Sequence, residues 1–498
     1  MTTYLTTAIP YVNAAPHLGH ALELVQADVL ARHLRSRGEP VRFLTGTDDN
    51  ALKNVTAARA VGQDVRTFVD ANAARFAALR GPLDLSFDDF IRTSADPRHA
   101  PGVARLWREC SDDFYLRSYE GLYCPGCEQF YAPGELSGGR CPEHLVAPEP
   151  IAERNWFFRL SRYQDQILKI LETDLVRVSP PARRNEVLAF VRAGLEDFSV
   201  SRPAVRALGW GVPVPGDPDQ VVYVWWDALT NYVTALGDGE EYRRWWQESD
   251  QRIHLIGKGI VRFHAVYWLA LLLSAGRPLP TAIHVHDYLT VDGAKVAKTA
   301  GNAVDPVALA GRYGTDAVRW WLLRDVAGVG DTDFTVDRLV QRHDQDLANG
   351  LGNLVHRVLT LTRRYRPDWV TALTGNGVRA GAGVPAGTGF LASTGFLAST
   401  DVPARIDLAL AAFDFRGALD ALWSAVDAGN RLVDAERPWE LHRRQDGERL
   451  DAVLATLLGL CRLAATEIAP FLPAGSARLL AQLDGTENPS PAFRRLGS

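Results

Sequence analysis

Hydrophobic residues in the first part of the chain alternate between short continuous runs and helical spacings. Residues 3–12 are rich in β-branched and aromatic side chains, which predicts a buried strand. Between residues 18 and 30 apolar side chains recur three or four positions apart. This spacing predicts an amphipathic helix with Pro16 in its first turn and Gly38 at its end. A second strand is predicted at 41–47, and strand–helix–strand with short links predicts a parallel α/β unit that binds ligands at the carboxyl ends of its strands.

The pattern changes farther along the chain. Residues 115–205 contain a cysteine-bearing loop, a run of aromatic residues and several prolines, so we expect an inserted domain there. Long helical periods dominate from about residue 305, and a Gly-, Ala-, Thr- and Ser-rich stretch at 371–403 predicts a flexible loop within a helical bundle. The predicted segments are two halves of an α/β domain at 1–114 and 206–285, the insertion at 115–205, a region with a lysine-containing loop at 286–345, and a helical domain at 346–498.

Composition narrows the class of protein. The chain has 498 residues, of which 47% are hydrophobic and 23% charged, and its net charge is −5. This profile excludes a disordered chain and a small disulfide scaffold, and it argues against a globally basic coat for nucleic acid. No run approaches the roughly 18 consecutive apolar residues that cross a bilayer. The five cysteines, an odd number, and the lack of basic residues at the start lead us to expect a cytoplasmic protein.

The segment PHLGH at 16–20 is the first candidate for chemistry. It places His17 and His20 three positions apart at the start of the predicted helix, with Gly19 between them. A helix N-terminus attracts anions through its N–H groups, and two imidazoles add donors, which favours a phosphate-binding site. The alternative is two surface histidines on an ordinary helix.

Lysine is rare in this chain, which draws attention to the lysines that are present. Only five of the 54 basic residues are lysines, and two of them, Lys295 and Lys298, lie three positions apart between glycines. A mobile loop with two compact ammonium groups suits phosphate chemistry, although a solvated basic loop is the alternative. Neither a P-loop sequence nor a Gly-x-Gly-x-x-Gly sequence after the first strand occurs.

Four potential metal ligands follow a paired spacing, Cys-x2-Cys-x13-Cys-x2-His. Three thiolates and one imidazole satisfy tetrahedral zinc, and a full set of four ligands leaves no open position for catalysis. The spacing therefore predicts one structural Zn²⁺, with unlinked buried cysteines as the alternative. The predicted ligands are Cys124, Cys127, Cys141 and His144.

Together these features resemble one family, the bacterial methionyl-tRNA synthetases of class I. PHLGH matches the family's HIGH motif, KVAKT at 295–299 occupies the position of KMSKS, and the cysteine loop is similar to the family's single zinc knuckle. The resemblance runs in order from residue 3 to about residue 480. It implies a Rossmann-like parallel-sheet catalytic domain, an inserted zinc-binding connective domain, a stem-contact region at 286–345 and a C-terminal α-helical anticodon-binding bundle.

The resemblance also implies an activity and its partners. These are ATP-dependent activation of L-methionine to methionyl-adenylate and transfer to tRNA(Met), with Mg²⁺ accompanying ATP and the zinc remaining structural. The implied catalytic residues are His17, His20, Lys295 and Lys298. The implied ATP-binding residues are His17, His20, Gly257 and Lys298.

The resemblance also assigns two further sets of residues by their positions in the sequence. The implied methionine-binding residues are Ile9, Tyr11, Asp48, Trp225, Ala228, Leu229, Tyr232, Ile260 and His264. The implied anticodon-binding residues are Asn353, Arg357 and Trp439. These residue types suit the implied ligands. A thioether fits an apolar, aromatic-lined slot, and unpaired bases are bound by stacking and by hydrogen bonds to their edges.

Several positions depart from the family pattern. The family's TDEHG is TDDNA at 47–51, an aspartate expected near the ATP ribose is Gly259, and KMSKS has lost its methionine and first serine. These changes leave alternatives open: a paralogue that activates methionine or an analogue for a non-translational product, an inhibitor-resistant second copy, or a catalytically weak RNA-binding paralogue. We expect a monomer, since the chain ends soon after the helical bundle.

Overall fold

The computed structural model describes residues 1–124, 129–143, 145–295, 303–369 and 401–497. Its backbone forms two compact units. The first unit holds residues 1–81 and 85–288, and the second holds residues 82–84 together with most of the chain after residue 288. The loop predicted at 371–403 lies almost entirely outside the described residues.

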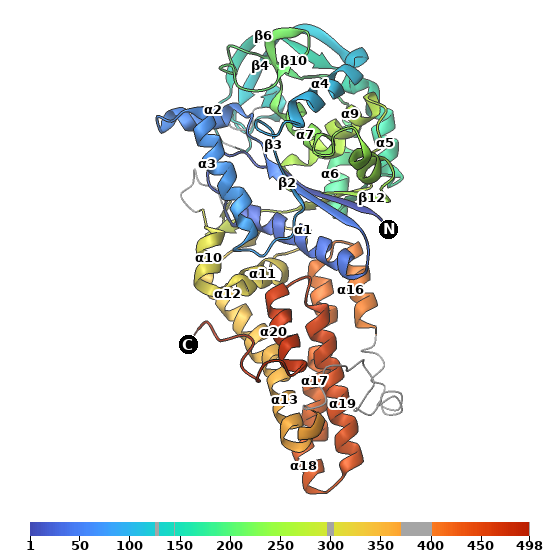
Figure 1. The fold of residues 1–498 in the computed structure, drawn as a ribbon. Helices are drawn as coiled ribbons and strands as arrows, with labels where there is room; N and C mark the ends of the chain where they lie inside the picture. The colour runs from blue at the N-terminus through green and yellow to red at the C-terminus, as the bar shows by residue number, and fades with distance from the viewer. Residues whose placement is uncertain (125–128, 144, 296–302, 370–400, 498) are drawn as a thin grey trace. The chain divides into compact units, whose positions relative to one another are not determined.

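A six-stranded parallel sheet forms the centre of the first unit (Figure 1). Its order is β3-β2-β1-β12-β13-β7, and Thr3 of β1 pairs with Val41 on one side and Gln251 on the other. The chain leaves β1 for β2 and β3 in one direction and later returns to β12 and β13 in the other, so the strand order reverses between β1 and β12. The strands are β1 (Thr3–Thr7), β2 (Val41–Thr47), β3 (Asp89–Arg92), β7 (Arg177–Ser179), β12 (Gln251–Gly257) and β13 (Ala282–His286).

Helices pack around this sheet over an aromatic core. Trp226, Trp246 and Trp268 are among its largest fully buried side chains. A π-helical turn at Phe263–Trp268 leads into the last helix of the unit. The helices are α1 (Leu18–Ser36), α2 (Leu52–Ala60), α3 (Val65–Ala77), α4 (His99–Glu109), α5 (Gln164–Glu172), α6 (Pro181–Arg192), α7 (Val224–Thr234), α8 (Glu240–Tyr242) and α9 (Leu269–Ser274).

Two smaller antiparallel sheets interrupt the parallel sheet. One has the order β5-β4-β6-β8 and the other β10-β11-β9. Within the range 115–205, strand β7 nevertheless pairs with β13 at the edge of the parallel sheet. The small strands are β4 (Phe114–Cys124), β5 (Gln129–Tyr131), β6 (Glu149–Phe158), β8 (Phe198–Ser199), β9 (Ser201–Pro203), β10 (Pro213–Val214) and β11 (Asp217–Val222).

The second unit is helical apart from one small sheet of order β15-β14-β16. The buried Arg319 guanidinium crosslinks it by donating to the carbonyl oxygens of Leu83 (2.9 Å) and Phe471 (2.7 Å). The strands are β14 (Leu289–Val291), β15 (Ala294–Lys295) and β16 (Thr332–Asp333). The helices are α10 (Pro306–Tyr313), α11 (Thr315–Arg324), α12 (Val336–Arg342), a π-helical segment His343–Gly352, α13 (Asn353–Tyr365), α16 (Val402–Ala411), α17 (Phe415–Glu436), α18 (Pro438–Arg443), α19 (Gly447–Glu467) and α20 (Pro473–Leu483).

The structure confirms the predicted fold class and adjusts two local boundaries. The first strand ends at Thr7 rather than at residue 12, because Pro10 has no N–H group with which to continue a ladder. The helix after it begins at Leu18 with His17 as its N-cap, so Pro16 lies just before the helix and not in its first turn. Among the described residues, no helix is both long and apolar enough to cross a bilayer.

Candidate active site at the carboxyl ends of the central strands

The topology brings the candidate residues of the first unit to one edge of its sheet. Ile9 and Tyr11 follow β1, Asp48 follows β2, and Gly257 ends β12. The backbone N–H of Asp48 donates to the carbonyl of Pro10 at 2.9 Å, which joins the two loops after β1 and β2. Ligands of open α/β sheets bind outside the carboxyl ends of the strands where the strand order reverses, and in this sheet that place is between β1 and β12.

The histidine pair forms the N-terminus of α1. The backbone N–H of Gly19 donates to Nδ1 of His17, and the backbone N–H of His17 donates to Nδ1 of His20, both at 3.1 Å. The two rings stack with centroids 3.8 Å apart. Because both Nδ1 atoms accept hydrogen bonds, each neutral ring carries its proton on Nε2. The caps therefore fix the tautomer of both histidines and make their Nε2–H groups donors.

The apolar residues predicted to bind methionine, here called the pocket wall, pack in the core of the first unit. Leu229 and Tyr232 of α7 belong to the main core of the unit, and Ile9, Trp225 and Ile260 pack against that core while remaining partly exposed. The indole of Trp225 stacks on a further aromatic ring, that of Phe263, with centroids 3.8 Å apart. Ala228 is buried in the same helix turn. The structure thus places these predicted methionine-binding residues in or against one core, and the rings of Tyr11 and Trp225 contact each other with centroids 6.2 Å apart.

One neutral polar pair lies within this apolar wall. Tyr232 Oη and His264 Nε2 are 2.7 Å apart, and His264 Nδ1 lies 3.0 Å from the carbonyl oxygen of Ile260. A carbonyl can only accept, so Nδ1 carries the proton and the tyrosine hydroxyl donates to Nε2. Burial lowers the pKa of His264 to about 4 and raises the pKa of Tyr232. The pair therefore stays uncharged at neutral pH.

The loop after β2 is fixed by a buried network. The backbone N–H of Asn50 donates to Oδ1 of Asp48 (3.2 Å), and its side-chain amide donates to Oδ2 of Asp227 (2.7 Å). The other Asp227 oxygen bonds Nε2 of His99 at 2.8 Å, and Nδ1 of His99 bonds the hydroxyl of Thr234 at 2.8 Å. Asn50 thereby connects the loop that carries Asp48 to α7, which carries the pocket wall.

Sequence reasoning missed two charged groups at this edge. Glu23 follows His20 by three positions on α1 and bonds Nε2 of His286, the last residue of β13, at 3.1 Å. Burial raises the pKa of Glu23; the imidazole's pKa is raised because the carboxylate outweighs the effect of burial. Asp49 accepts two hydrogen bonds from Arg92 on one oxygen, which ties β2 to β3. An acidic residue one turn after His20 was a visible signal, whereas its partner 263 positions away was not.

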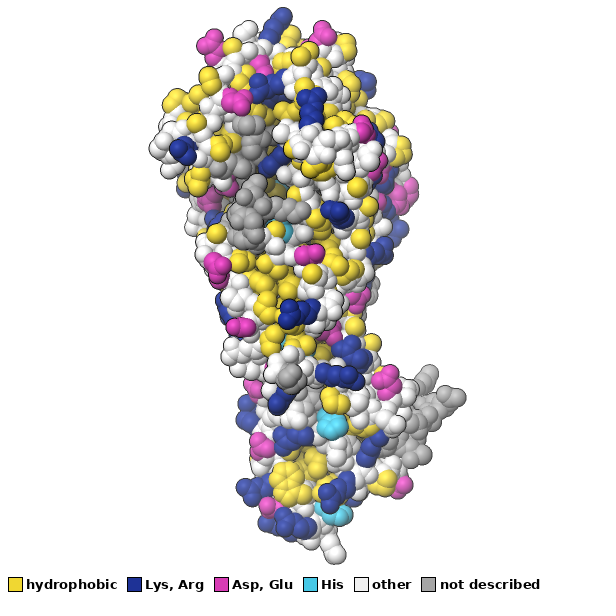
Figure 2. All heavy atoms as spheres, turned by 90° about the vertical axis from the view of Figure 1, so that its left-hand side faces the viewer, with side chains coloured by type: hydrophobic (Ala, Val, Ile, Leu, Met, Phe, Trp, Pro, Cys, Tyr) yellow, Lys and Arg dark blue, Asp and Glu magenta, His cyan; other side chains and the backbone are white. Residues whose placement is uncertain are grey.

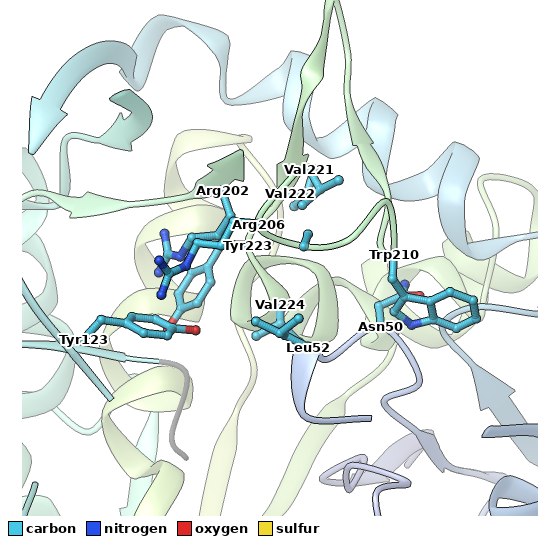
Figure 3. Close-up of a pocket in the computed structure, with 11 residues that line it drawn as sticks. Asn50, Leu52, Tyr123, Arg202, Arg206, Trp210, Val221, Val222, Tyr223 and Val224 are labelled. Carbon is cyan, nitrogen blue, oxygen red and sulfur yellow. The ribbon is translucent and has the colours of Figure 1, made fainter. Parts of the chain in front are cut away.

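A hollow that is open to solvent lies in the first unit, between the small sheets and the loop after β2 (Figure 3). Arg202 lies over the ring of Tyr223 (4.1 Å to its centroid), and Arg206 lies over the ring of Tyr123 (4.8 Å). Figure 3 shows these four side chains grouped on one side of the hollow, with Asn50 on the other. None of the nine predicted methionine-binding residues lines this hollow.

The predicted metal ligands are described only in part. Cys124 and Cys141 are both fully buried and share a small cluster with Tyr131. The thiol of Cys141 lies 3.5 Å from the Tyr131 hydroxyl. Cys127 and His144 lie outside the described residues, and the part of the chain that is described holds no cluster of three potential metal ligands.

The predicted lysine loop belongs to the second unit at its start. Lys295 ends β15, where it pairs in register with Thr290 of β14. Asp333 holds this hairpin by accepting from the Thr290 hydroxyl (2.8 Å) and the backbone N–H of Gly293 (3.0 Å). These bonds lower the pKa of Asp333. Lys298 lies outside the described residues.

The predicted anticodon residues lie on two helices of the second unit. Asn353 and Arg357 are one turn apart on α13, and Arg357 forms an ion pair with Asp434 at 3.3 Å. Trp439 of α18 is 37% exposed although it is a large aromatic residue. In Figure 2, basic side chains and histidines gather over the lower, helical part of the surface. Three arginines near Trp439 have side chains more than half exposed: Arg437, Arg443 and Arg444.

Known proteins match the chain along nearly its whole length. A family model described as tRNA synthetases class I (M) matches residues 3–148 and 144–359, and one described as the anticodon binding domain of methionyl tRNA ligase matches residues 397–494. The methionine–tRNA ligase of Nostoc sp. is 39% identical over 495 residues, which cover 97% of this chain and 90% of that protein. The corresponding enzyme of Thermotoga maritima is 37% identical over 499 residues, covering 98% and 76%.

A solved structure also matches nearly the whole chain. The structure of Mycobacterium tuberculosis methionyl-tRNA synthetase in complex with methionyl-adenylate aligns with a TM-score of 0.88 and 37% identity, covering 99% of this chain and 100% of that one. The parallel sheet, its histidine pair and these matches define a class I aminoacyl-tRNA synthetase. Within that class, the chain belongs to the methionyl-tRNA ligase family, which confirms the resemblance seen in the sequence.

Proposed function

We propose that this chain is a methionine–tRNA ligase. It activates L-methionine with ATP to methionyl-adenylate and transfers the methionyl group to tRNA(Met), releasing pyrophosphate and AMP. The observation that carries the proposal is a juxtaposition in the first unit. The capped histidine pair at the N-terminus of α1 follows β1, and Ile9 and Ile260 of the pocket wall follow β1 and β12 at the carboxyl edge of the same sheet, in a chain that matches the family throughout.

The activation step needs positioning and charge stabilisation rather than a covalent enzyme intermediate. A carboxylate oxygen of methionine forms a bond to the α-phosphorus of ATP as the bond to pyrophosphate breaks. The Nε2–H groups of His17 and His20 donate to phosphate oxygens as negative charge grows on them, and their tautomers are already set by the α1 cap. Lys295, Lys298 and the backbone at Gly257 complete the ATP site. Mg²⁺ bound with ATP would be held mainly by phosphate oxygens and water and would neutralise phosphate charge.

Methionine is recognised by the pocket wall. The carboxylate of Asp48 binds the substrate ammonium, with Tyr11 at the border of the site. The thioether lies against the aromatic surface of Trp225, where sulfur–ring contacts are favourable. Tyr232 and His264 provide the polar end of the pocket, and their neutrality suits an uncharged side chain. A lysine or glutamate side chain would leave its charge without a partner there.

The connective region holds one structural Zn²⁺. Cys124, Cys127, Cys141 and His144 supply the tetrahedral donor set that this ion prefers. Two observations support the fit: the thiols of Cys124 and Cys141 are buried in one small cluster, and each belongs to a different half of the paired spacing. Thiolate ligation by zinc would organise this region of short strands.

The second unit reads the anticodon of tRNA(Met). Asn353 and Arg357 present an amide and a guanidinium from adjacent turns of α13, and these groups hydrogen bond to base edges. The partly exposed indole of Trp439 provides a stacking surface for an unpaired base.

Two assays test the proposal in sequence. The first is methionine-dependent ATP–pyrophosphate exchange, and the second is aminoacylation of initiator and elongator tRNA(Met). We expect exchange and charging, with methionine preferred over leucine and norvaline. Exchange without charging of either tRNA would favour a paralogue with a non-translational product. Absence of exchange together with retained tRNA binding would favour an RNA-binding paralogue.

A further inference from the structure

The hydroxyl of Tyr288 fills the space beside Gly259. A Cβ atom placed on Gly259 would lie 2.0 Å from Oη of Tyr288 and 3.3 Å from its Cζ. Non-bonded carbon and oxygen atoms do not approach within 3.0 Å of one another without displacing one of them. Any side chain at position 259 and the tyrosine hydroxyl at its present place therefore exclude each other.

This contact lies at the ligand-binding edge of the first unit. Gly259 follows β12, and Tyr288 follows β13. Strand β12 is hydrogen bonded to β1, whose following loop leads to the histidine pair. Ligands of doubly wound sheets extend across the reversal point from the first helix N-terminus towards the neighbouring strands. An ATP molecule with its phosphates at the start of α1 can reach the turn after β12 with its nucleoside end.

The surroundings hold the tyrosine ring in place while its tip faces the turn. Nζ of Lys258 lies 4.7 Å from the centroid of the Tyr288 ring, within cation–π range. A Cβ placed on Gly257 would be 3.8 Å from Cε1 of the same ring, an ordinary contact distance. The ring is thus packed against the Gly-Lys-Gly turn, and Tyr288 remains partly exposed.

We propose that Tyr288 is a nucleotide-binding residue whose hydroxyl hydrogen bonds to a ribose hydroxyl of ATP. A phenol both donates and accepts, as a ribose hydroxyl does, so the pair can form in either direction without a charge. The glycine at 259 is what makes room for this group. The inference rests on the proposed function, because it takes ATP as the nucleotide of this site.

The first test combines Tyr288→Phe with nucleotides that lack one hydroxyl. Binding of ATP, 2′-deoxy-ATP and 3′-deoxy-ATP is measured by calorimetry without methionine. Losing one neutral hydrogen bond should weaken ATP binding by about three- to tenfold. In the variant, the preference for ATP over one of the deoxy nucleotides should fall by the same factor. Equal weakening of all three nucleotides, or no weakening of ATP binding, would overturn the inference.

The second test uses the mutual exclusion at position 259. Gly259→Asp alone should weaken ATP binding, because the new side chain displaces the hydroxyl. With Tyr288→Phe present, the nearest remaining atom is Cζ at 3.3 Å, so the carboxylate can take the vacated place and restore the ribose preference. If the losses of ATP affinity in the two single variants simply add in the double variant, the proposal is contradicted.

Controls separate this inference from the proposed function and from simple destabilisation. Tyr115→Phe removes a comparable hydroxyl, bonded to Asp197 at 2.8 Å, from the small β4-containing sheet, and it should leave nucleotide binding unchanged. The KM for methionine in the exchange assay should not change in Tyr288→Phe. If the wild type binds ATP with a ribose preference but shows no exchange, the proposed function fails while the role of Tyr288 stands. A wild type that binds none of the nucleotides overturns both.

Discussion

Removing the side-chain amide of Asn50 should weaken methionine binding more than ATP binding. The amide donates to Oδ2 of Asp227 at 2.7 Å and to the carbonyl of Thr93 at 3.3 Å. Asp227 is 1% exposed and lies in α7, so Asn50→Ala leaves a buried carboxylate oxygen without its donor. The helix that carries the pocket wall then loses its connection to the loop that carries Asp48.

The expected size follows from the contacts that remain. A buried acceptor left without its donor costs about 1–3 kcal/mol, which corresponds to about 5- to 150-fold in an equilibrium constant. His99 still bonds the other oxygen of Asp227, and the backbone N–H of Asn50 still donates to Asp48. Because His99 still anchors α7 and the loop keeps its own bond, we expect the lower part of the range, about a tenfold rise in the KM for methionine.

The assay is ATP–pyrophosphate exchange with methionine and ATP varied separately. Asn50→Asp tests the same contact more sharply, because it places a second carboxylate at hydrogen-bonding distance from that of Asp227. Two such groups share a proton most easily at low pH, so the defect of this variant should grow as pH rises. Asn349→Ala is the matched control, because this exposed amide of the second unit accepts from Arg495 (2.7 Å). A methionine KM within twofold of wild type in Asn50→Ala, or an equal rise in the KM for ATP, would refute the reasoning.

Three further predictions concern other parts of the molecule. Burial lowers the pKa of His264 from 6.5 to about 4, so the unfolded chain binds one more proton than the folded chain between these pH values. The free energy of unfolding should therefore fall as the pH drops from 6.5 to 4, which chemical denaturation at pH 4.5 and 7 measures. In His264→Gln this dependence of stability on pH should be smaller. Cys141→Ser should abolish the one zinc ion per chain that we expect by elemental analysis, and an unchanged zinc content would exclude this ligand. Trp439→Ala should weaken charging of tRNA(Met) by about 1–3 kcal/mol, the value of one base stack, while exchange remains at the wild-type rate.

The controls for these predictions use residues of the same kind elsewhere. Cys461→Ser, in the buried core of α19, should leave the zinc content unchanged. Trp423→Phe, whose indole packs against Trp320 at 4.6 Å, should affect stability rather than the selectivity for tRNA(Met). Equal loss of exchange and charging in Trp439→Ala would indicate a structural role for this residue.

Local features of the site were predictable from sequence, and long-range ones were not. The strand at 41–47 and the histidine pair each lie within a few consecutive residues, so periodicity and motif spacing carry the whole signal. The three-residue strand β7 is too short for alternation to mark it, and only its pairing with β13 places it in the parallel sheet. The bond from Asn50 to Asp227 joins residues 177 positions apart, which no local pattern can encode.

The departures from the family pattern are matched by other residues of the first unit. Asn50, at the position of a family histidine, is bonded to the buried Asp227, and the space that a side chain at Gly259 would need is filled by Tyr288. Drift in an unused site would leave cavities and unpaired polar atoms, because nothing would select for their replacement. At both positions the structure instead has a specific contact in place of the family residue. These matched replacements argue for a site that still binds its substrates, and against a paralogue that has kept only RNA binding.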